Sequence, residues 1–111
     1  MRDPRVRLED IAEAIAGIRE TLEGVDFRRF ESSWQMRRAV ERGQEIISEA
    51  SRGLDDETRT AHPQVPWSDI AGIGNVLRHE YHRVEALIIW NITVDHLPVL
   101  ARAIEDLLGE G

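Results

Sequence analysis

Residues 74–84, GNVLRHEYHRV, concentrate the side chains that could do chemistry on a phosphate group. His79 and His82 carry imidazoles, which take up and release protons near neutral pH. Arg78 and Arg83 carry guanidinium groups, which bind phosphate oxygens through two parallel hydrogen bonds. The segment therefore predicts a phosphate-binding face on a helix. The alternative is that these residues form the solvated end of that helix.

A second group of basic residues lies in RRFESSWQMRR, residues 28–38. Its arginines are Arg28, Arg29, Arg37 and Arg38, and Arg42 follows one turn later. They could flank the same cleft and hold more phosphate. The alternative, which the nearby Glu31 and Glu41 favour slightly, is a solvated helix face on which opposite charges balance.

The two histidines do not match a familiar metal motif. His79 and His82 are three residues apart, whereas the zinc-protease motif H-E-x-x-H places its histidines four apart. The sequence has no cysteine, which excludes thiolate ligands, a thiol nucleophile and disulfides. No third metal ligand is evident, and nothing points to a serine–histidine–aspartate triad. We therefore expect a site that uses no metal or other cofactor.

The elements that position these residues are expected to be helices, because apolar residues repeat at intervals of three and four along most of the chain. The spacing predicts three long helices, over about residues 5–23, about residues 27–53 with a bend near Ser32 and Ser33, and about residues 85–109. In the last of these, Pro98 must cause a kink or open a new segment near Thr93 or Asp95.

A further helix carries the histidine segment. Pro66 suits its first turn, and the predicted buried stripe is Ile70, Ile73, Gly74, Leu77 and Tyr81. His79 falls roughly opposite this stripe, with Asn75, Arg78 and His82 between. Before it, LDDETRTAHP could form one or two turns, and HPQVPW is a loop because two prolines three apart cannot sit inside a helix. The prediction is an all-α, up-and-down bundle of four to five helices in a single domain, residues 1–111.

Charge and composition restrict the class of protein. The 111 residues carry a formal net charge of −7, which argues against a protein that coats nucleic acid regardless of sequence. All 14 basic residues are arginine, so every cation can bind phosphate through two hydrogen bonds. The N-terminal segment has no apolar signal-peptide core and no run approaches a membrane span, so we expect a cytoplasmic protein with no membrane partner.

Three segments resemble the HepT-like family of the HEPN superfamily, which are small, helical, homodimeric toxins of toxin–antitoxin pairs. AVERGQEIISEASRGL, residues 39–54, resembles the family helix that contains E-I-I-G-E-A. PWSDIAGIGNVLRHEY, residues 66–81, resembles P-W-x-x-I-x-G-x-R-N-x-x-x-H-x-Y and is the most specific of the three. WNITVDHLPVLARAIEDLL, residues 90–108, resembles the closing helix, proline included.

The resemblance implies a HEPN-like fold and a metal-independent ribonuclease site, in which an arginine and a histidine from each protomer face their copies across a dimer cleft. His79 matches the catalytic histidine and Asn75 matches the motif asparagine. Tyr81 matches the tyrosine to which an MntA-like nucleotidyltransferase antitoxin attaches AMP. The remaining candidates for RNA contact are Arg37, Arg38, His82 and Arg83.

The motif arginine does not carry over, because its position is Gly74. Losing such a donor costs about a hundred- to a thousandfold in rate. One hypothesis is that Arg78, one turn later, reaches back toward this position, since helical side chains lean toward the N-terminus. The other is that Gly74 is a small packing residue, the catalytic pair is broken, and a binding module for RNA, nucleotide or the nucleotidyltransferase remains. We leave both open at this point and favour the second slightly.

Overall fold

The computed structural model describes residues 3–79 and 86–109, and over these ranges the chain consists of helices joined by short turns and loops. The helices are α1 (Pro4–Leu22), α2 (Phe27–Ser32), α3 (Trp34–Arg52), α4 (Asp56–Thr60), α5 (Trp67–His79) and α6 (Ala86–Gly109). This confirms the predicted all-α fold. Four of the six helices are long, and α2 and α4 are single short segments between them.

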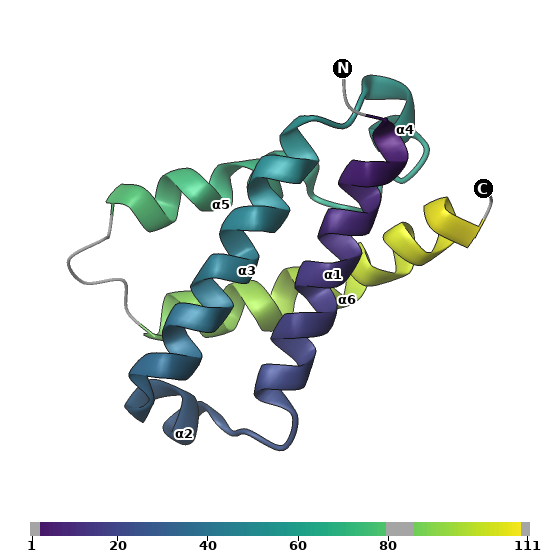
Figure 1. The fold of residues 1–111 in the computed structure, drawn as a ribbon. Coiled ribbons are helices and arrows are strands. Elements are labelled where there is room, and N and C mark those ends of the chain that lie inside the picture. The colour runs from purple at the N-terminus through teal and green to yellow at the C-terminus, as the bar shows by residue number, and fades with distance from the viewer. Residues whose placement is uncertain (1–2, 80–85, 110–111) are drawn as a thin grey trace.

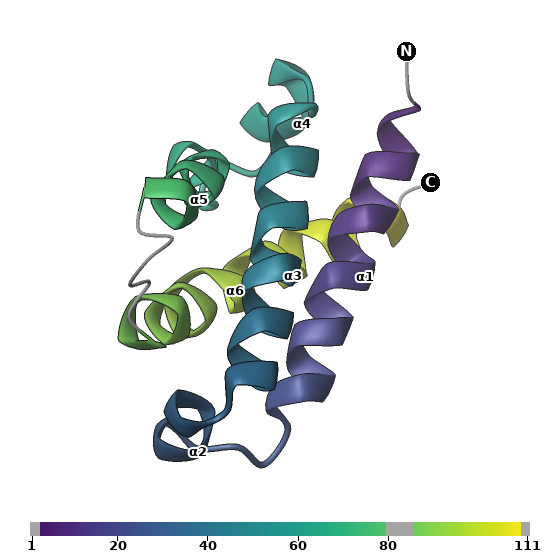
Figure 2. The same cartoon turned by 60° about the vertical axis from the view of Figure 1, so that its left-hand side comes forward.

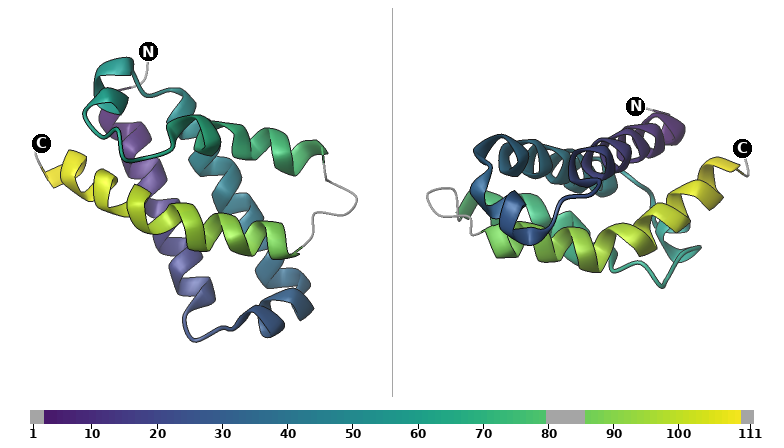
Figure 3. Two further views of the ribbon diagram at one scale, coloured as in Figure 1. Left: turned by 180° about the vertical axis from the view of Figure 1, so that it is seen from behind. Right: turned by 90° about the horizontal axis from the view of Figure 1, so that it is seen from below.

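The long helices form two layers. α1 and α3 lie side by side and antiparallel, and α5 and α6 cross them on one face (Figures 1 and 3). α3 is the central element, because it contacts α1, α2, α5 and α6. Figure 2 shows α5 packed along the C-terminal half of α3. This contact sets the environment of the histidine-bearing helix.

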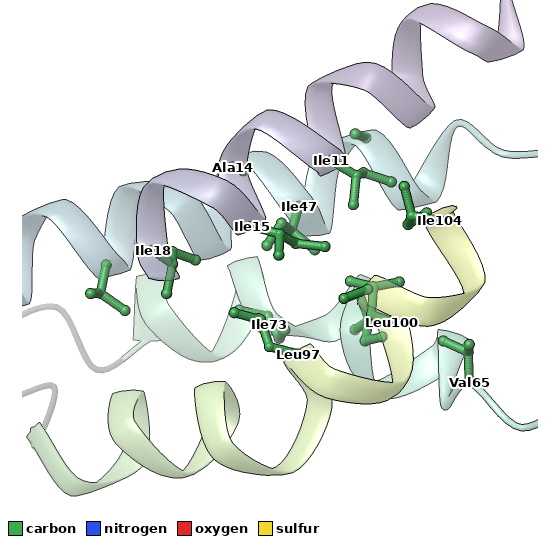
Figure 4. Packing of buried hydrophobic residues seen from close by; sticks show 14 of the residues in the cluster. Ile11, Ala14, Ile15, Ile18, Ile47, Val65, Ile73, Leu97, Leu100 and Ile104 are labelled. Atoms are coloured by element: carbon green, nitrogen blue, oxygen red, sulfur yellow. The ribbon is translucent and has the colours of Figure 1, made fainter. Parts of the chain in front are cut away.

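The core lies between the two layers and consists almost entirely of aliphatic side chains. From α1 it takes Ile11, Ile15 and Ile18, which the apolar repeat in the sequence had predicted to share one face (Figure 4). From the second layer it takes residues such as Ile73 and Leu100, which point at the same centre. The helix that carries the candidate site is therefore fixed by its buried side, and its other side faces solvent.

The second predicted helix, 27–53, is two helices rather than one bent helix. Ser33 has extended backbone angles, φ −106° and ψ 106°, and its hydroxyl accepts a hydrogen bond from the backbone N–H of Met36 at 3.1 Å. A serine that caps a new helix in this way competes with continuation of the old one. The rings of Phe27 and Phe30 pack at 5.7 Å and 5.4 Å from that of Trp90, which holds α2 against α6.

The start of α5 differs from the prediction by one residue. Pro66 lies just before the helix, where its carbonyl oxygen accepts a hydrogen bond from the N–H of Ile70 at 3.1 Å. The preceding segment, 62–66, is a loop as predicted, and α4 is a short helix where one or two turns had been predicted.

α6 continues through Pro98, and Figure 3 shows that the helix changes direction along its length, as expected where a proline removes a helical hydrogen bond. Contrary to the expectation that no run approaches a membrane span, this helix is long and apolar enough by composition to cross a membrane, with a mean hydropathy of 1.3 in its most apolar window. Its buried residues include Ile89, Leu97, Leu100 and Ile104, so α6 serves as a core helix of the bundle.

Candidate functional site

The candidate site is built on α5, whose N-terminal end is held firmly. The indole N–H of Trp67 donates to the backbone oxygens of Arg59 and His62, both at 3.0 Å. Ile70 and Leu77, at the two ends of the apolar stripe, are both buried. These contacts orient the helix, so that the side away from the stripe faces solvent.

Gly74 is a point of contact between α5 and α3. Its backbone N–H donates to the hydroxyl of Ser48 at 3.0 Å, and that hydroxyl donates to the carbonyl oxygen of Ala71 at 2.8 Å. A β-carbon at position 74 would lie only 3.2 Å from the Ser48 oxygen. Position 74 is therefore a tightly packed backbone contact in which Ser48 is a full partner.

Sequence reasoning missed Ser48, although a signal was present. In the family pattern E-I-I-G-E-A, the residue at the position of Ser48 is glycine. The chain thus departs from the family at two positions, 48 and 74, and the structure places these two residues in contact.

Arg78 is exposed, and its side chain lies back along α5 toward Gly74. Its Nη1 atom is 3.5 Å from the place that a β-carbon at position 74 would occupy. No carboxylate among residues 3–79 and 86–109 forms an ion pair with it. The guanidinium therefore occupies the space beside Gly74, and no carboxylate of the described ranges pairs with it.

A cleft of about 570 Å³ opens beside these residues, and Ser48, Gly74, Leu77 and Arg78 form part of its wall. Arg52 also lines it and was not among the predicted residues. Its Nε–H donates to the carbonyl oxygen of Ala71 at 3.0 Å, which ties the end of α3 to α5. Arg52 was missed because only the packing of α3 on α5 brings it near position 74.

The other predicted residues of the motif lie on α5 or outside the described part of the chain. Asn75 is exposed on α5, next to Gly74, and His79 is the last residue of that helix. Tyr81, His82 and Arg83 lie outside the described residues. Of the predicted group, the structure brings Arg78 to the cleft.

The second basic cluster is not part of this cleft, apart from Arg42. Arg38 forms a two-point ion pair with Glu41, with distances of 2.8 Å and 3.0 Å, and its guanidinium lies 5.9 Å from the ring of Trp34. The Nε–H of Arg37 donates to the carbonyl oxygen of Ser33 at 3.4 Å. The charge balance with Glu41 that the sequence suggested is therefore present.

Glu41 is a buried carboxylate outside the cleft. Burial raises its pKa above the ordinary value of 4.5, and the neighbouring charge of Arg38 opposes this rise. The carboxylate pairs with Arg38 near the start of α3, and it does not line the cleft.

Across residues 3–79 and 86–109, no three histidine, aspartate or glutamate side chains are grouped so that they could hold a metal ion. The described site offers guanidinium, carboxylate and hydroxyl groups around an open cleft, beside a helix that ends at a histidine.

Comparison with known proteins identifies a family. Residues 11–107 match the family model described as "Ribonuclease HepT-like". The chain is 36% identical over 108 residues to a protein named "Putative RNase" of Caldanaerobacter subterraneus subsp. tengcongensis, which covers 97% of this chain and 96% of the relative. It is 33% identical over 104 residues to a "Putative RNase" of Methanocaldococcus jannaschii, covering 94% and 95% of the two chains.

A third relative is named "Probable ribonuclease HepT", from Thermococcus cleftensis. It is 35% identical over 100 residues, or 90% of this chain and 91% of its own. No solved structure gave a significant match.

Proposed function

Because the chain belongs to the HepT-like ribonuclease family of the HEPN superfamily, we propose that it is a metal-independent endoribonuclease in which Arg78 replaces the arginine missing at position 74. The observation that carries this proposal is the position of the Arg78 guanidinium, 3.5 Å from the place of a β-carbon at Gly74. The cleft beside it is open, and no described carboxylate pairs with Arg78.

The proposed reaction is attack by a ribose 2′-oxygen on the adjacent phosphorus. A P–O2′ bond forms, the P–O5′ bond breaks, and the product carries a 2′,3′-cyclic phosphate. His79 takes the proton from the 2′-hydroxyl or gives one to the 5′-oxygen that leaves, and the copy from a second protomer would supply the other step. Arg78 would stabilise the negative charge on the phosphorane oxygens, while Asn75 would orient the RNA.

A second candidate function is a HEPN module that binds RNA, nucleotide or a nucleotidyltransferase without cleaving. Gly74 is the observation that favours it, because the residue packs against Ser48 and supplies no cation. The two functions differ in cleavage and agree in binding, so one experiment separates them.

The experiment is incubation of the purified protein with bulk cellular RNA in EDTA. We expect wild-type protein to cleave, and we expect Arg78→Ala and His79→Ala to lose about a hundred- to a thousandfold in rate. Arg102→Ala is the matched control, because Arg102 is an exposed arginine on α6, which contributes nothing to the cleft. Binding without cleavage in the wild type would support the second function. Full activity in Arg78→Ala would remove Arg78 from the proposed site.

The partners follow from the same proposal: a homodimer, RNA, and an MntA-like nucleotidyltransferase antitoxin, in the cytoplasm and without a membrane. Tyr81 is the proposed AMP acceptor. A nucleotide two residues after His79 would add negative charge and bulk where RNA phosphate has to bind. Mass spectrometry of the protein co-expressed with that nucleotidyltransferase should find AMP on Tyr81. AMP confined to other residues would contradict the assignment, and a Tyr81→Phe variant is the control.

A further inference from the structure

The cleft beside Arg78 extends along α3 and carries more positive charge than one phosphate requires. Besides Arg78 it is lined by Arg7 from α1 and by Arg42 and Arg52 from α3, with Glu45 and Glu49 as its acidic residues. Four cations against two anions make it locally positive in a chain whose formal net charge is −7. The surroundings would repel RNA, so this cleft is where its backbone can approach.

Resting on the function proposed above, we propose that Arg52, Arg7 and Arg42 form a subsite for the RNA phosphates that adjoin the one held by Arg78. Arg42 and Arg52 are ten residues apart on the side of α3 that faces the cleft, which corresponds to about 15 Å along the helix. The nucleotides of a stacked strand are spaced by about 3.4 Å, so this length accommodates several of them.

Arg52 is prepared for this role by its contact with α5. Its Nε–H is used by the carbonyl oxygen of Ala71, at 3.0 Å, and none of its Nη groups has a hydrogen-bond partner among the described residues. One hydrogen bond thus restrains the guanidinium, and the residue lines the cleft. A guanidinium fixed before binding loses less conformational freedom when it binds phosphate.

Arg7 lies against the end of α3. A β-carbon at Gly53 would overlap the Arg7 guanidinium, so the glycine at this helix end makes room for the cation. The guanidinium also lies at the C-terminus of α3, where the partial negative charge of a helix favours a cation. Within the described part of the chain, no carboxylate forms a salt bridge with Arg7 or Arg52.

The acidic residues limit how tightly the cleft can bind. Arg42 contacts Glu45 at 3.4 Å, and both side chains are largely exposed, so this ion pair is weak and can give way to phosphate. Glu49 lines the cleft between Arg42 and Arg52, and its charge opposes a bound strand. Removing the charge of Glu49 should therefore strengthen RNA binding, whereas removing an arginine of the cleft should weaken it.

The test is fluorescence anisotropy with a labelled single-stranded oligoribonucleotide whose 2′-hydroxyls are methylated, because this probe cannot be cleaved. Affinity is measured over about 50 to 200 mM salt, and each lost phosphate contact should reduce the slope of log K against log salt by about 0.7. Arg52→Ala and Arg7→Ala should each bind more weakly with this reduced slope. Arg102→Ala should leave the slope unchanged.

Two further variants separate charge from shape and exclude misfolding. Arg52→Lys should keep the wild-type salt slope and lose affinity, since it keeps the charge and loses the two-point contact. Glu49→Gln should bind more tightly than wild type. Thermal unfolding of each variant shows whether it is folded, and the gain in Glu49→Gln cannot come from misfolding.

The result that would overturn the proposal is an unchanged affinity and salt slope in Arg52→Ala. The proposal would also be wrong if the cleft bound only one phosphate group. In that case AMP or inorganic phosphate would displace the oligoribonucleotide at equal concentration. Failure of the proposed function looks different. In that case natural RNA is not cleaved by the wild type, while the methylated probe still binds and still depends on Arg52.

Discussion

Positions 48 and 74 show how two residue changes can be linked. Ser48 gives two hydrogen bonds to α5, one accepted from the N–H of Gly74 and one donated to Ala71. An arginine at 74 would push its β-carbon to 3.2 Å from the Ser48 oxygen and its side chain toward Arg78. The serine thus favours glycine at 74, and glycine leaves room for Arg78.

Gly74→Arg alone should therefore fail to raise cleavage. Arginine favours the interior of a helix over glycine by about 1 kcal/mol. The new β-carbon, however, has to displace Ser48, whose hydroxyl is fixed by two hydrogen bonds. We expect an unchanged or lower rate with bulk RNA. A gain of about a hundred- to a thousandfold would show instead that the site lacks its arginine and that Arg78 does not supply it.

Restoring both family residues should give a different result. In an Arg78→Ala background, the pair Ser48→Gly and Gly74→Arg provides space and a cation together. We expect it to recover most of the cleavage that Arg78→Ala loses. Ser48→Gly in the same background is the control, since it opens the space without adding charge. Equal rates in the two variants would contradict the replacement of one arginine by the other.

Glu41 makes a prediction about pH. Burial raises the pKa of its carboxyl in the folded protein above 4.5, so between 4.5 and that higher value the folded chain holds more protons than the unfolded one. Stability from this group is therefore present at low pH and lost as pH rises. Glu41→Gln cannot titrate. Urea unfolding should show the stability of the variant relative to wild type increasing from below pH 4.5 to neutral pH, and the opposite trend would contradict the assignment.

At the scale of the elements, Ser33 separates α2 from α3. Its hydroxyl caps α3 through the N–H of Met36. Ser33→Ala should lower the free energy of unfolding by about 1 kcal/mol, as loss of such a cap generally does. Ser32→Ala is the matched control, because the Ser32 hydroxyl donates to the carbonyl oxygen of Arg29 and caps no helix. Equal effects of the two changes in urea unfolding would show that the cap contributes nothing.

The sequence predicted the elements well where each depends on local spacing. The stripe from Ile70 to Leu77 is buried as predicted, because a 3.6-residue period directly encodes one face of a helix. The break at Ser33 was seen only as a bend, since the apolar spacing runs on through it. Ser33 is a local capping signal, but the break at this residue also depends on the packing of α2 against α6.

The site could be predicted only along its own helix. Asn75, Arg78 and His79 were predicted together because they are close in sequence. Ser48 lies 26 residues before Gly74, and its contact arises from the packing of α3 on α5. Arg52 and Arg7 join the cleft for the same reason, from two helices whose relative position no local pattern specifies.

At the scale of the whole molecule, charge is distributed unevenly. The chain has 21 acidic and 14 basic residues, yet the α3–α5 cleft is lined by twice as many arginines as glutamates. A local excess of positive charge directs an anionic ligand to one place on an otherwise repelling surface. This attraction weakens as salt is added, so the salt dependence of RNA binding measures it.

The surface also carries apolar side chains that a monomer does not explain. Leu87 and Val94 are 50% and 55% exposed, and their spacing of seven residues puts them on one side of α6. Val76 on α5 is 42% exposed. The end of α5 and the start of α6 lie on the same side of the molecule (Figures 1 and 3). Covering these residues with a second copy would bring two copies of the end of α5 near each other.

The protein should therefore be a dimer in solution, and Leu87→Glu combined with Val94→Glu should make it a monomer. Burying two carboxylates in an apolar interface without partners is costly, whereas the same side chains are harmless in water. Light scattering at micromolar concentration measures the mass, and Val6→Glu is the control, since Val6 is 38% exposed on α1. The monomeric variant should also lose RNA cleavage, because a lone protomer then has one copy of His79 for two proton transfers. A wild-type monomer, or a monomeric variant that cleaves at the full rate, would show that one chain carries the whole site.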